Sequence, residues 1–311
     1  NAATNEGVTA VMFAVRGSPM VHPEMLADAK ADIDATNPND LIRFLLAHEG
    51  ATECLQMLLD AKANVDATNF EGNTALTIAA GRGQSACLQL LLDAKAQVNA
   101  VNRVGETALT LAASSGHTAC LQMLVDANAD VNATNKIGDT ALITAANNGH
   151  VACVRVLLEA KADIDAGKDT ALTLAADKGH VECLQLLLES QANISVRNQH
   201  GDTALIIAAD TGYTECLRLL LENNADISDR TQDGDTALIL VADKGHAAGL
   251  QLLLDVKADI ATKNNRGGTA LMVAAFQGHT RCVQLLVYAK ATVDVKRQDG
   301  KITLAVARAK G

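Results

Sequence analysis

The chain has 311 residues, with no tryptophan, two tyrosines, four phenylalanines and a formal net charge of −10. Because phosphate binding needs clustered lysine and arginine side chains, this charge argues against nucleic acid and anionic membrane surfaces as partners, and it permits a basic partner protein. No apolar run approaches the ~18 residues of a membrane-spanning helix, so no direct membrane insertion is expected. With so few aromatic rings, the core must be built from small aliphatic contacts, which alanine and leucine can supply.

An internal repeat organises the sequence. The motif Thr-Ala-Leu recurs every 33 residues, with one interval of 30, and its threonines are Thr74, Thr107, Thr140, Thr170, Thr203, Thr236 and Thr269. Weaker copies at Thr9 and Ile302 keep the register. We therefore expect about nine repeats, with irregular copies over 1–69, regular copies over 70–300 and an incomplete copy over 301–311.

One regular copy, at 138–166, indicates how each unit folds. Thr140 can cap the N-terminus of a short helix rich in small residues, and Gly149 can adopt the positive φ that ends it. A second helix follows, with apolar residues at the spacing of one helical face, and then an extended segment and a tight turn. Neither helix can bury its apolar face alone, so the copies must stack. This predicts a single solenoid over 1–311.

These motifs resemble the ankyrin repeat, over nearly the whole chain. The family pattern is a turn, Gly-x-Thr-Pro-Leu-His, Ala-Ala, Gly-His, an aliphatic second helix and Gly-Ala-Asp-Val-Asn. The resemblance implies an all-α solenoid of stacked helix-turn-helix repeats with β-hairpin or finger loops. One systematic departure is Ala-Leu followed by Thr, Ile or Met, as at Ala75-Leu76-Thr77, in place of Pro-Leu-His.

A second departure concerns the glycine that the family has after the second helix. Here the residues are Lys62, Lys95, Asn128, Lys161, Gln191, Asn224, Lys257 and Lys290. A left-handed helix end favours glycine or asparagine, so a lysine there would cost on the order of 1 kcal/mol unless the helix ends differently. The two departures together suggest a distinct subfamily.

The two ends of the sequence fall inside repeats. Residues 1–5 match 131–135, and 301–311 stop after one predicted helix. Terminal repeats usually carry a polar cap, and neither end clearly does. We therefore interpret the chain as a fragment of a longer protein.

Cysteines and histidines occur once per repeat, in fixed positions. The cysteines are Cys54, Cys87, Cys120, Cys153, Cys183, Cys216 and Cys282, and Gly249 takes their place in one copy. Stacked helices lie roughly 8–10 Å apart, whereas a disulfide needs Cα atoms within about 7 Å and a metal needs converging ligands. We predict core packing for the cysteines, a structural role for the histidines and no metal site. Unpaired thiols favour a reducing intracellular compartment, such as the cytoplasm.

Catalysis is not expected of these residues. An active site needs unlike groups that converge in a pocket, whereas this sequence repeats like groups along a line. There is no phosphate-binding loop and no nucleophile motif. The chain is therefore expected not to be an enzyme, and no cofactor is implied.

Two columns of acidic residues are candidates for partner binding. The first column precedes the capping threonine and includes Asp139, Asp169, Asp202 and Asp235. The second column ends the first helix, at Asp177, Asp210 and Asp243. The resemblance places both on the concave face, as an acidic stripe that suits a basic partner segment, although Lys178 and Lys244 dilute it. The alternative for the first column is a favourable interaction with the helix macrodipole.

The loop tips offer a second candidate surface. Phe70, Val104 and Ile137 occupy three successive tips, and Phe276 could add an anchor at the end of a later first helix. Clustered apolar side chains at exposed tips suggest a binding patch, and chance is the alternative. The next loop, 167–169, has three residues where other copies have six. A neutral deletion is the simpler interpretation, because surface turns tolerate length changes, and a seat for a partner is the alternative.

Asn99 and Asn132 resemble the ankyrin asparagines that a cytosolic oxygenase hydroxylates, in a partial sequence context. Taken together, the sequence predicts a non-catalytic protein–protein interaction module or scaffold that binds a partner through the concave face and finger tips. Two alternatives remain open. One is a structural subunit or spacer in a large assembly, and the other is the regulatory ankyrin region of a larger channel, kinase or other multidomain protein.

Overall fold

The computed structural model describes residues 51–60 and 62–290, which contain fifteen helices. They are α4 (Ala51–Asp60), α5 (Ala75–Gly81), α6 (Ser85–Asp93), α7 (Ala108–Ser115), α8 (Thr118–Asp126), α9 (Ala141–Asn147), α10 (Val151–Glu159), α11 (Ala171–Lys178), α12 (Val181–Glu189), α13 (Ala204–Thr211), α14 (Thr214–Glu222), α15 (Ala237–Lys244), α16 (Ala247–Asp255), α17 (Ala270–Gln277) and α18 (Thr280–Tyr288). The predicted copies around Thr9 and Ile302 lie outside the described residues.

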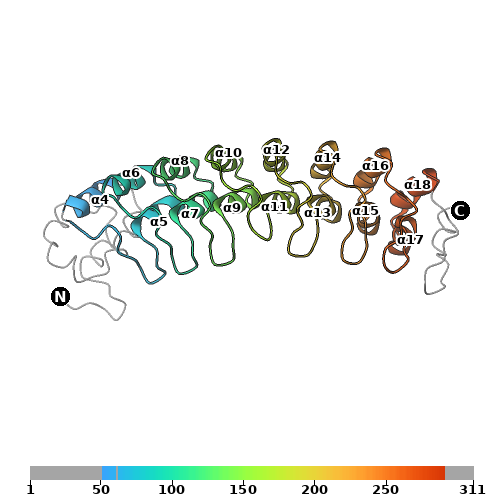
Figure 1. The fold of residues 1–311 in the computed structure, drawn as a ribbon, viewed down its shortest axis with the longest axis horizontal. Helices are drawn as coiled ribbons and strands as arrows, with labels where there is room; N and C mark the ends of the chain where they lie inside the picture. Colours follow the sequence, from blue (N-terminus) through green and yellow to red (C-terminus); the bar gives the residue numbers. More distant parts are fainter. Residues whose placement is uncertain (1–50, 61, 291–311) are drawn as a thin grey trace, which may run out of the picture. The chain divides into compact units, whose positions relative to one another are not determined.

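Each regular repeat is a first helix, a glycine turn, a second helix and a long loop, so the predicted solenoid of stacked helix-turn-helix repeats is confirmed. The odd-numbered helices are the first helices, and they lie between the even-numbered second helices and the loops (Figure 1). Within the described residues the loops form no sheet, and only two isolated β-bridges occur, Arg197 with Thr203 and Arg230 with Thr236.

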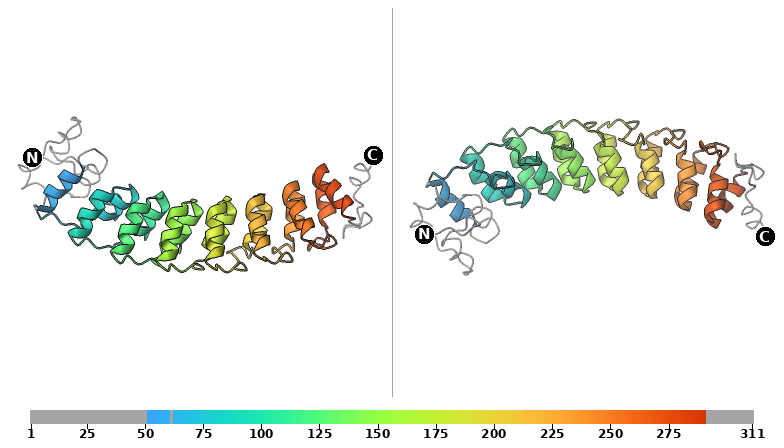
Figure 2. Two further views of the ribbon diagram at one scale, coloured as in Figure 1. Left: turned by 90° about the horizontal axis from the view of Figure 1, so that it is seen from above. Right: turned by 90° about the horizontal axis from the view of Figure 1, so that it is seen from below.

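The described residues belong to two compact units. Unit 1 runs up to Asp163 without 146–151, and unit 2 consists of 146–151 and the chain from Ile164 onward. In unit 1, α4 packs on α6 and α6 on α8, while α5 packs on α7. In unit 2, the first helices from α11 to α17 contact one another in order, and the second helices from α12 to α18 lie side by side (Figure 2).

Threonine begins the first helices as the motif predicts. Thr140 Oγ1 accepts a hydrogen bond from the backbone N–H of Ile143 at 3.3 Å. Thr107 and Thr110 form a complete capping box, in which each side chain bonds the backbone N–H of the other residue. Thr107, Thr110 and Thr140 are buried, and the helix N-terminus provides partners for their hydroxyl groups. Thr203 and Thr236 make no such capping bond, and Thr203 Oγ1 is buried without a hydrogen-bond partner among the described residues.

The eight residues that replace glycine after the second helix all adopt the left-handed conformation, with φ between 61° and 67°. In one example, Lys161 N–H donates to Leu158 O and Ala162 N–H donates to Leu157 O, both at 3.0 Å. This is the Schellman arrangement, which pairs the last carbonyl groups of the helix. The expected left-handed helix end is therefore confirmed, and five of these positions carry lysine.

The core consists mainly of alanine and leucine from the first helices and of cysteine and leucine from the second helices. One repeat has a larger side chain at one core position and a smaller one at another. Val241 stands where the other regular copies have alanine, and Gly249 stands where they have cysteine. A Cβ atom on Gly249 would lie 3.3 Å from Val241 Cγ1 and 3.1 Å from Leu217 Cδ2. The valine side chain therefore occupies part of the space that a cysteine fills in the other copies.

Histidines link successive repeats. His279 Nε2 donates to Asp243 O at 2.7 Å, and Asp243 lies in the last turn of the preceding first helix. A Cβ atom on Gly245, which has a φ of 77°, would lie 2.7 Å from the His279 ring. This glycine is therefore needed for its backbone conformation and for the close approach of the ring. The geometry confirms the structural role predicted for His279.

The hydrogen bonds between successive repeats run mainly in one direction. Asp130 N–H donates to Asn99 Oδ1 at 2.9 Å, and Asp163 N–H donates to Asn132 Oδ1 at 2.8 Å. As at His279, the donor belongs to the later repeat and the acceptor to the earlier one. Most of these bonds thus join a donor of one repeat to an acceptor of the repeat before it, whereas Arg197 and Arg230 donate to the repeat after them.

Candidate functional site

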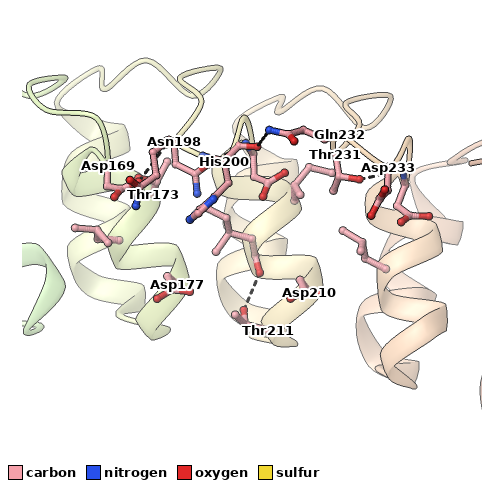
Figure 3. A pocket seen from close by; sticks show the side chains of 17 residues that line it. Asp169, Thr173, Asp177, Asn198, His200, Asp210, Thr211, Thr231, Gln232 and Asp233 are labelled. Carbon is pink, nitrogen blue, oxygen red and sulfur yellow. Dashed lines mark hydrogen bonds between the residues drawn. The ribbon is translucent and has the colours of Figure 1, made fainter. Parts of the chain in front are cut away.

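A groove of about 580 Å³ runs across three repeats of unit 2, along α11, α13 and α15 and the loops that precede them (Figure 3). The apolar side chains that line it are Leu174, Ile206, Ile207 and Leu240. Most of its other lining residues are carboxylates, amides and hydroxyls. The groove therefore combines an apolar surface with an acidic one.

Five predicted acidic residues line this groove, in two rows. The finger-base carboxylates are Asp169, Asp202 and Asp235, one per repeat, and the helix-end carboxylates are Asp177 and Asp210. Figure 3 shows Asp169 near the loops and Asp177 and Asp210 at the far ends of the helices. The sequence-based grouping of these five residues is thus reproduced in space.

The two rows differ in how their charge is compensated. Lys178 Nζ lies 2.8 Å from Asp177, and Lys244 Nζ lies 3.2 Å from Asp210. No cationic side chain of the described residues lies within 4 Å of a finger-base carboxylate. The lysines therefore pair with the helix-end row, and the finger-base row has no salt bridge within the described part of the chain.

Asp202 also lacks a neutral hydrogen-bond partner that its neighbour has. Asn264, in the loop after Asp235, donates its Nδ2–H to Asp235 Oδ1 at 2.7 Å. The loop after Asp202 has Thr231 at the corresponding position, and the Thr231 hydroxyl instead accepts from Asp235 N–H at 3.1 Å. Consequently Asp202 Oδ1 is buried and has no hydrogen-bond partner.

Burial changes the ionisation of two finger-base residues. Burial raises the pKa of the Asp202 carboxyl, and the nearby His200 only partly opposes this rise. Burial also raises the pKa of Asp235, against the effect of its hydrogen bond from Asn264. A cation placed in the groove would favour the ionised form of both carboxylates.

The shortened loop 167–169 borders the groove and keeps its link to the next loop through a side chain. In three full-length loops a backbone N–H donates to the tip carbonyl of the preceding loop, as Asn265 does to Asp233 O at 3.0 Å. The shortened loop lacks that tip residue. Gln199 N–H donates instead to Asp169 Oδ1, at 3.3 Å.

Two arginines that sequence analysis did not select hold the loops beside the groove. Arg197 Nη1 donates to Gly201 O at 2.7 Å within its own loop, and its other terminal nitrogen pairs with Asp229. Arg230 Nη1 reaches Lys263 O in the following loop at 2.9 Å. The available signal was that two successive copies carry arginine where the others have threonine, valine or lysine. These bonds fix the shape of the groove wall.

The structure does not bring the remaining acidic and apolar candidates into this groove. Asp139 belongs to unit 1. Asp243 Oδ1 accepts from Gln277 Nε2 at 2.8 Å, outside the groove lining. Phe276 is 71% exposed at the end of α17 and does not line the groove either.

The apolar loop tips of unit 1 are exposed, as predicted. Phe70 is 60% exposed, Val104 56% and Ile137 80%. Val101, which sequence analysis did not select, is a further exposed apolar residue close to Val104 in the sequence. A second hollow, of about 420 Å³, has Phe70 and Val104 in its lining. These tips form the apolar tip surface of unit 1.

The other predicted groups have structural surroundings. Asn99 and Asn132 are exposed, and each Oδ1 accepts a backbone hydrogen bond from the next repeat. The cysteines whose side chains are described are buried, and none of them forms a disulfide. Among the described residues, no group of histidine, cysteine, aspartate and glutamate is arranged to hold a metal ion. None of the described helices has the length and apolar character that a membrane span requires.

Comparison with known proteins identifies the class. A family model that describes three copies of the ankyrin repeat matches residues 44–135, 128–198, 165–231 and 227–299. The chain therefore belongs to the ankyrin-repeat family. Among solved structures it is similar to the human ASB11 ankyrin repeat domain, with 28% identity and a TM-score of 0.62, over 77% of this chain and 99% of that one. No curated protein matches the sequence.

Proposed function

We propose that this chain is a non-catalytic protein-interaction module that binds a basic segment of a partner protein in the groove of unit 2. Ankyrin repeats are generally protein–protein interaction modules, which supports the class of function. The observation that carries the choice of site is the row of finger-base carboxylates, Asp169, Asp202 and Asp235, which have no cationic partner in the groove.

The lining of the groove suits lysine and arginine side chains. Their long apolar stems can lie along Ile206, Ile207 and Leu240, while the charged ends reach the finger-base carboxylates. The wall is already fixed by hydrogen bonds between loops, such as Gln232 Nε2 to His200 O at 2.9 Å. A preformed wall loses little conformational freedom on binding, which favours affinity.

The apolar tip surface of unit 1 is a second candidate contact. Its exposed Phe70, Val104 and Ile137 would suit apolar side chains of the same partner or of another protein. A spacer in an assembly, or a regulatory region of a larger protein, would use these repeats differently. Variants of the two surfaces can separate these possibilities.

Affinity capture from cell lysate at increasing salt tests the proposal. The groove variant is Asp202→Asn/Asp235→Asn, in which each asparagine keeps an acceptor oxygen. The control variant is Glu189→Gln/Glu222→Gln, which removes two exposed charges from the ends of α12 and α14. We expect at least one salt-sensitive partner to be lost with the groove variant alone. Retention of every partner by the groove variant at all salt concentrations would refute the groove as the binding site.

The tip variant Phe70→Ser/Val104→Ser/Ile137→Ser tests the second surface in the same assay. Exposed substitutions usually change stability by less than about 0.5 kcal/mol, so the fold should persist. Loss of a salt-insensitive partner would assign an apolar contact to the tips. An unchanged set of partners would remove the tips as a contact.

A further inference from the structure

We propose that the groove binds an extended segment in the polyproline II conformation, with a basic side chain at every third residue. This inference rests on the proposed function and specifies the spacing of the partner's charges. The observation behind it is that the finger-base carboxylates, which form no salt bridge with the described residues, occur once per repeat in three consecutive repeats. A further carboxylate of the lining, Asp233, lies at the tip of the third loop.

The spacing follows from the stacking of the repeats. Packed helices lie roughly 8–10 Å apart, and α11, α13 and α15 contact one another in order. A polyproline II segment has three residues per turn and rises about 3.1 Å per residue, so every third side chain faces the same way, about 9.3 Å apart. Six residue steps then cover about 19 Å, close to the two repeat intervals between Asp169 and Asp235.

A β-strand does not match this spacing. Its side chains on one face recur about every 6.7 Å, and residues three apart point to opposite faces. An α-helix could present residues seven apart at about 10.5 Å, but the backbone groups between its two ends are paired internally. The backbone of a polyproline II segment is unpaired, and the polar side chains of Gln199 and His200 in the groove lining can reach it.

Asp202, the middle carboxylate, is the finger-base residue whose charge is least compensated by hydrogen bonds within the protein. Its buried Oδ1 has no hydrogen-bond partner, although the residue lines the groove. A guanidinium group carries five N–H donors and a fixed positive charge, so an arginine at the middle position would compensate this carboxylate. The first basic residue would lie at Asp169, where the shortened loop has no projecting tip and the segment can leave the groove.

Two nine-residue peptides of equal composition test the inference. One contains three consecutive Arg-Pro-Pro units, and the other contains three adjacent arginines followed by six prolines. Both carry the same charge and favour the same backbone conformation, so only the spacing differs. Fluorescence anisotropy at low salt measures their affinity for the full chain. We expect the spaced peptide to bind about tenfold more tightly or better.

The variants make the result specific to the groove. Asp202→Asn/Asp235→Asn should abolish the preference, whereas Glu189→Gln/Glu222→Gln should keep it, with folding checked by circular dichroism. Equal affinity for both peptides, weakened equally by the groove variant, would overturn the spacing and leave the proposed function standing. Absence of binding, or binding that the groove variant does not weaken, would overturn both. A helical peptide with arginine at every seventh residue that binds more tightly than the spaced peptide would also overturn it.

Discussion

The exchange of sizes between Val241 and Gly249 predicts strong energetic coupling between the two positions. In the other regular copies, alanine stands at the position of Val241 and cysteine at the position of Gly249. We consider Val241→Ala, Gly249→Cys and the double variant, which restores the common pair. Each single change disturbs the packing, and the double change should repair it.

The expected magnitudes follow from the contacts. Val241 is fully buried, and Val241→Ala removes two carbon atoms worth about 0.8 kcal/mol each and leaves a cavity beside a glycine, so the loss should be about 2–3 kcal/mol. In Gly249→Cys the new Cβ would lie 3.1 Å from Leu217 Cδ2 and 3.3 Å from Val241 Cγ1. Overpacking costs about 1–3 kcal/mol, partly offset by about 0.5–1 kcal/mol from replacing a helical glycine.

The double variant should lie within about 1 kcal/mol of the natural protein, which corresponds to a favourable coupling of about 2–3 kcal/mol. Urea unfolding of all four proteins, followed by far-UV circular dichroism, measures it. As a control, Val241→Ala combined with Cys183→Gly, two repeats away, should be additive. Additive losses in the Val241→Ala/Gly249→Cys pair would refute the idea that valine fills the space of the missing cysteine side chain.

Three further predictions concern backbone strain and ionisation. Lys257→Gly should stabilise the chain by about 0.5–1 kcal/mol in urea unfolding, because it relieves the left-handed conformation, whereas Asn224→Gly should change little; equal effects would contradict the strain. Burial raises the pKa of the Cys216 thiol to about 11, so mass-spectrometric labelling at pH 8 should modify Cys216 only on unfolding, and rapid labelling of the native chain would contradict this. Burial raises the pKa of Asp202 above its value in the unfolded chain, so the folded chain binds the carboxyl proton more tightly. The contribution of Asp202 to folding stability therefore falls as the pH rises from the unfolded pKa to the folded pKa. Asp202→Asn should therefore raise the melting temperature at pH 7, with a gain that fades as pH falls toward about 3.9, whereas a pH-independent gain would refute this cause.

Much of the fold could be predicted from the sequence because each repeat depends on local chemistry. A capping hydroxyl at Thr140, a positive φ at Gly149 and a left-handed residue at Lys161 each act within a few residues of the chain. The spacing of apolar residues then leaves stacking as the means of burying both helices. The helix caps and turns could therefore be inferred from the place of each residue within the repeat.

The site was predicted only in part, because its properties depend on contacts between repeats. The acidic columns were visible in the sequence, but the pairing of Lys244 with Asp210 joins residues 34 positions apart. The unpaired state of Asp202 depends on Thr231 in the next loop, where an asparagine would have supplied a donor. The separation of Phe276 from the groove likewise required the three-dimensional arrangement.

The hydrogen bonds that join each repeat to the next bear on how such an array can change in length. A repeat duplicated within a unit would offer the same donors and acceptors to the copies on either side, so a whole period can be added while the bonds between repeats are kept. A partial deletion has no such safeguard, because it removes one member of a bond and leaves the other. After the shortened loop 167–169, the Asp169 carboxylate accepts the hydrogen bond that a loop-tip carbonyl accepts elsewhere. A deletion shorter than one repeat is therefore expected to be tolerated only where a nearby side chain can replace the lost hydrogen-bond partner.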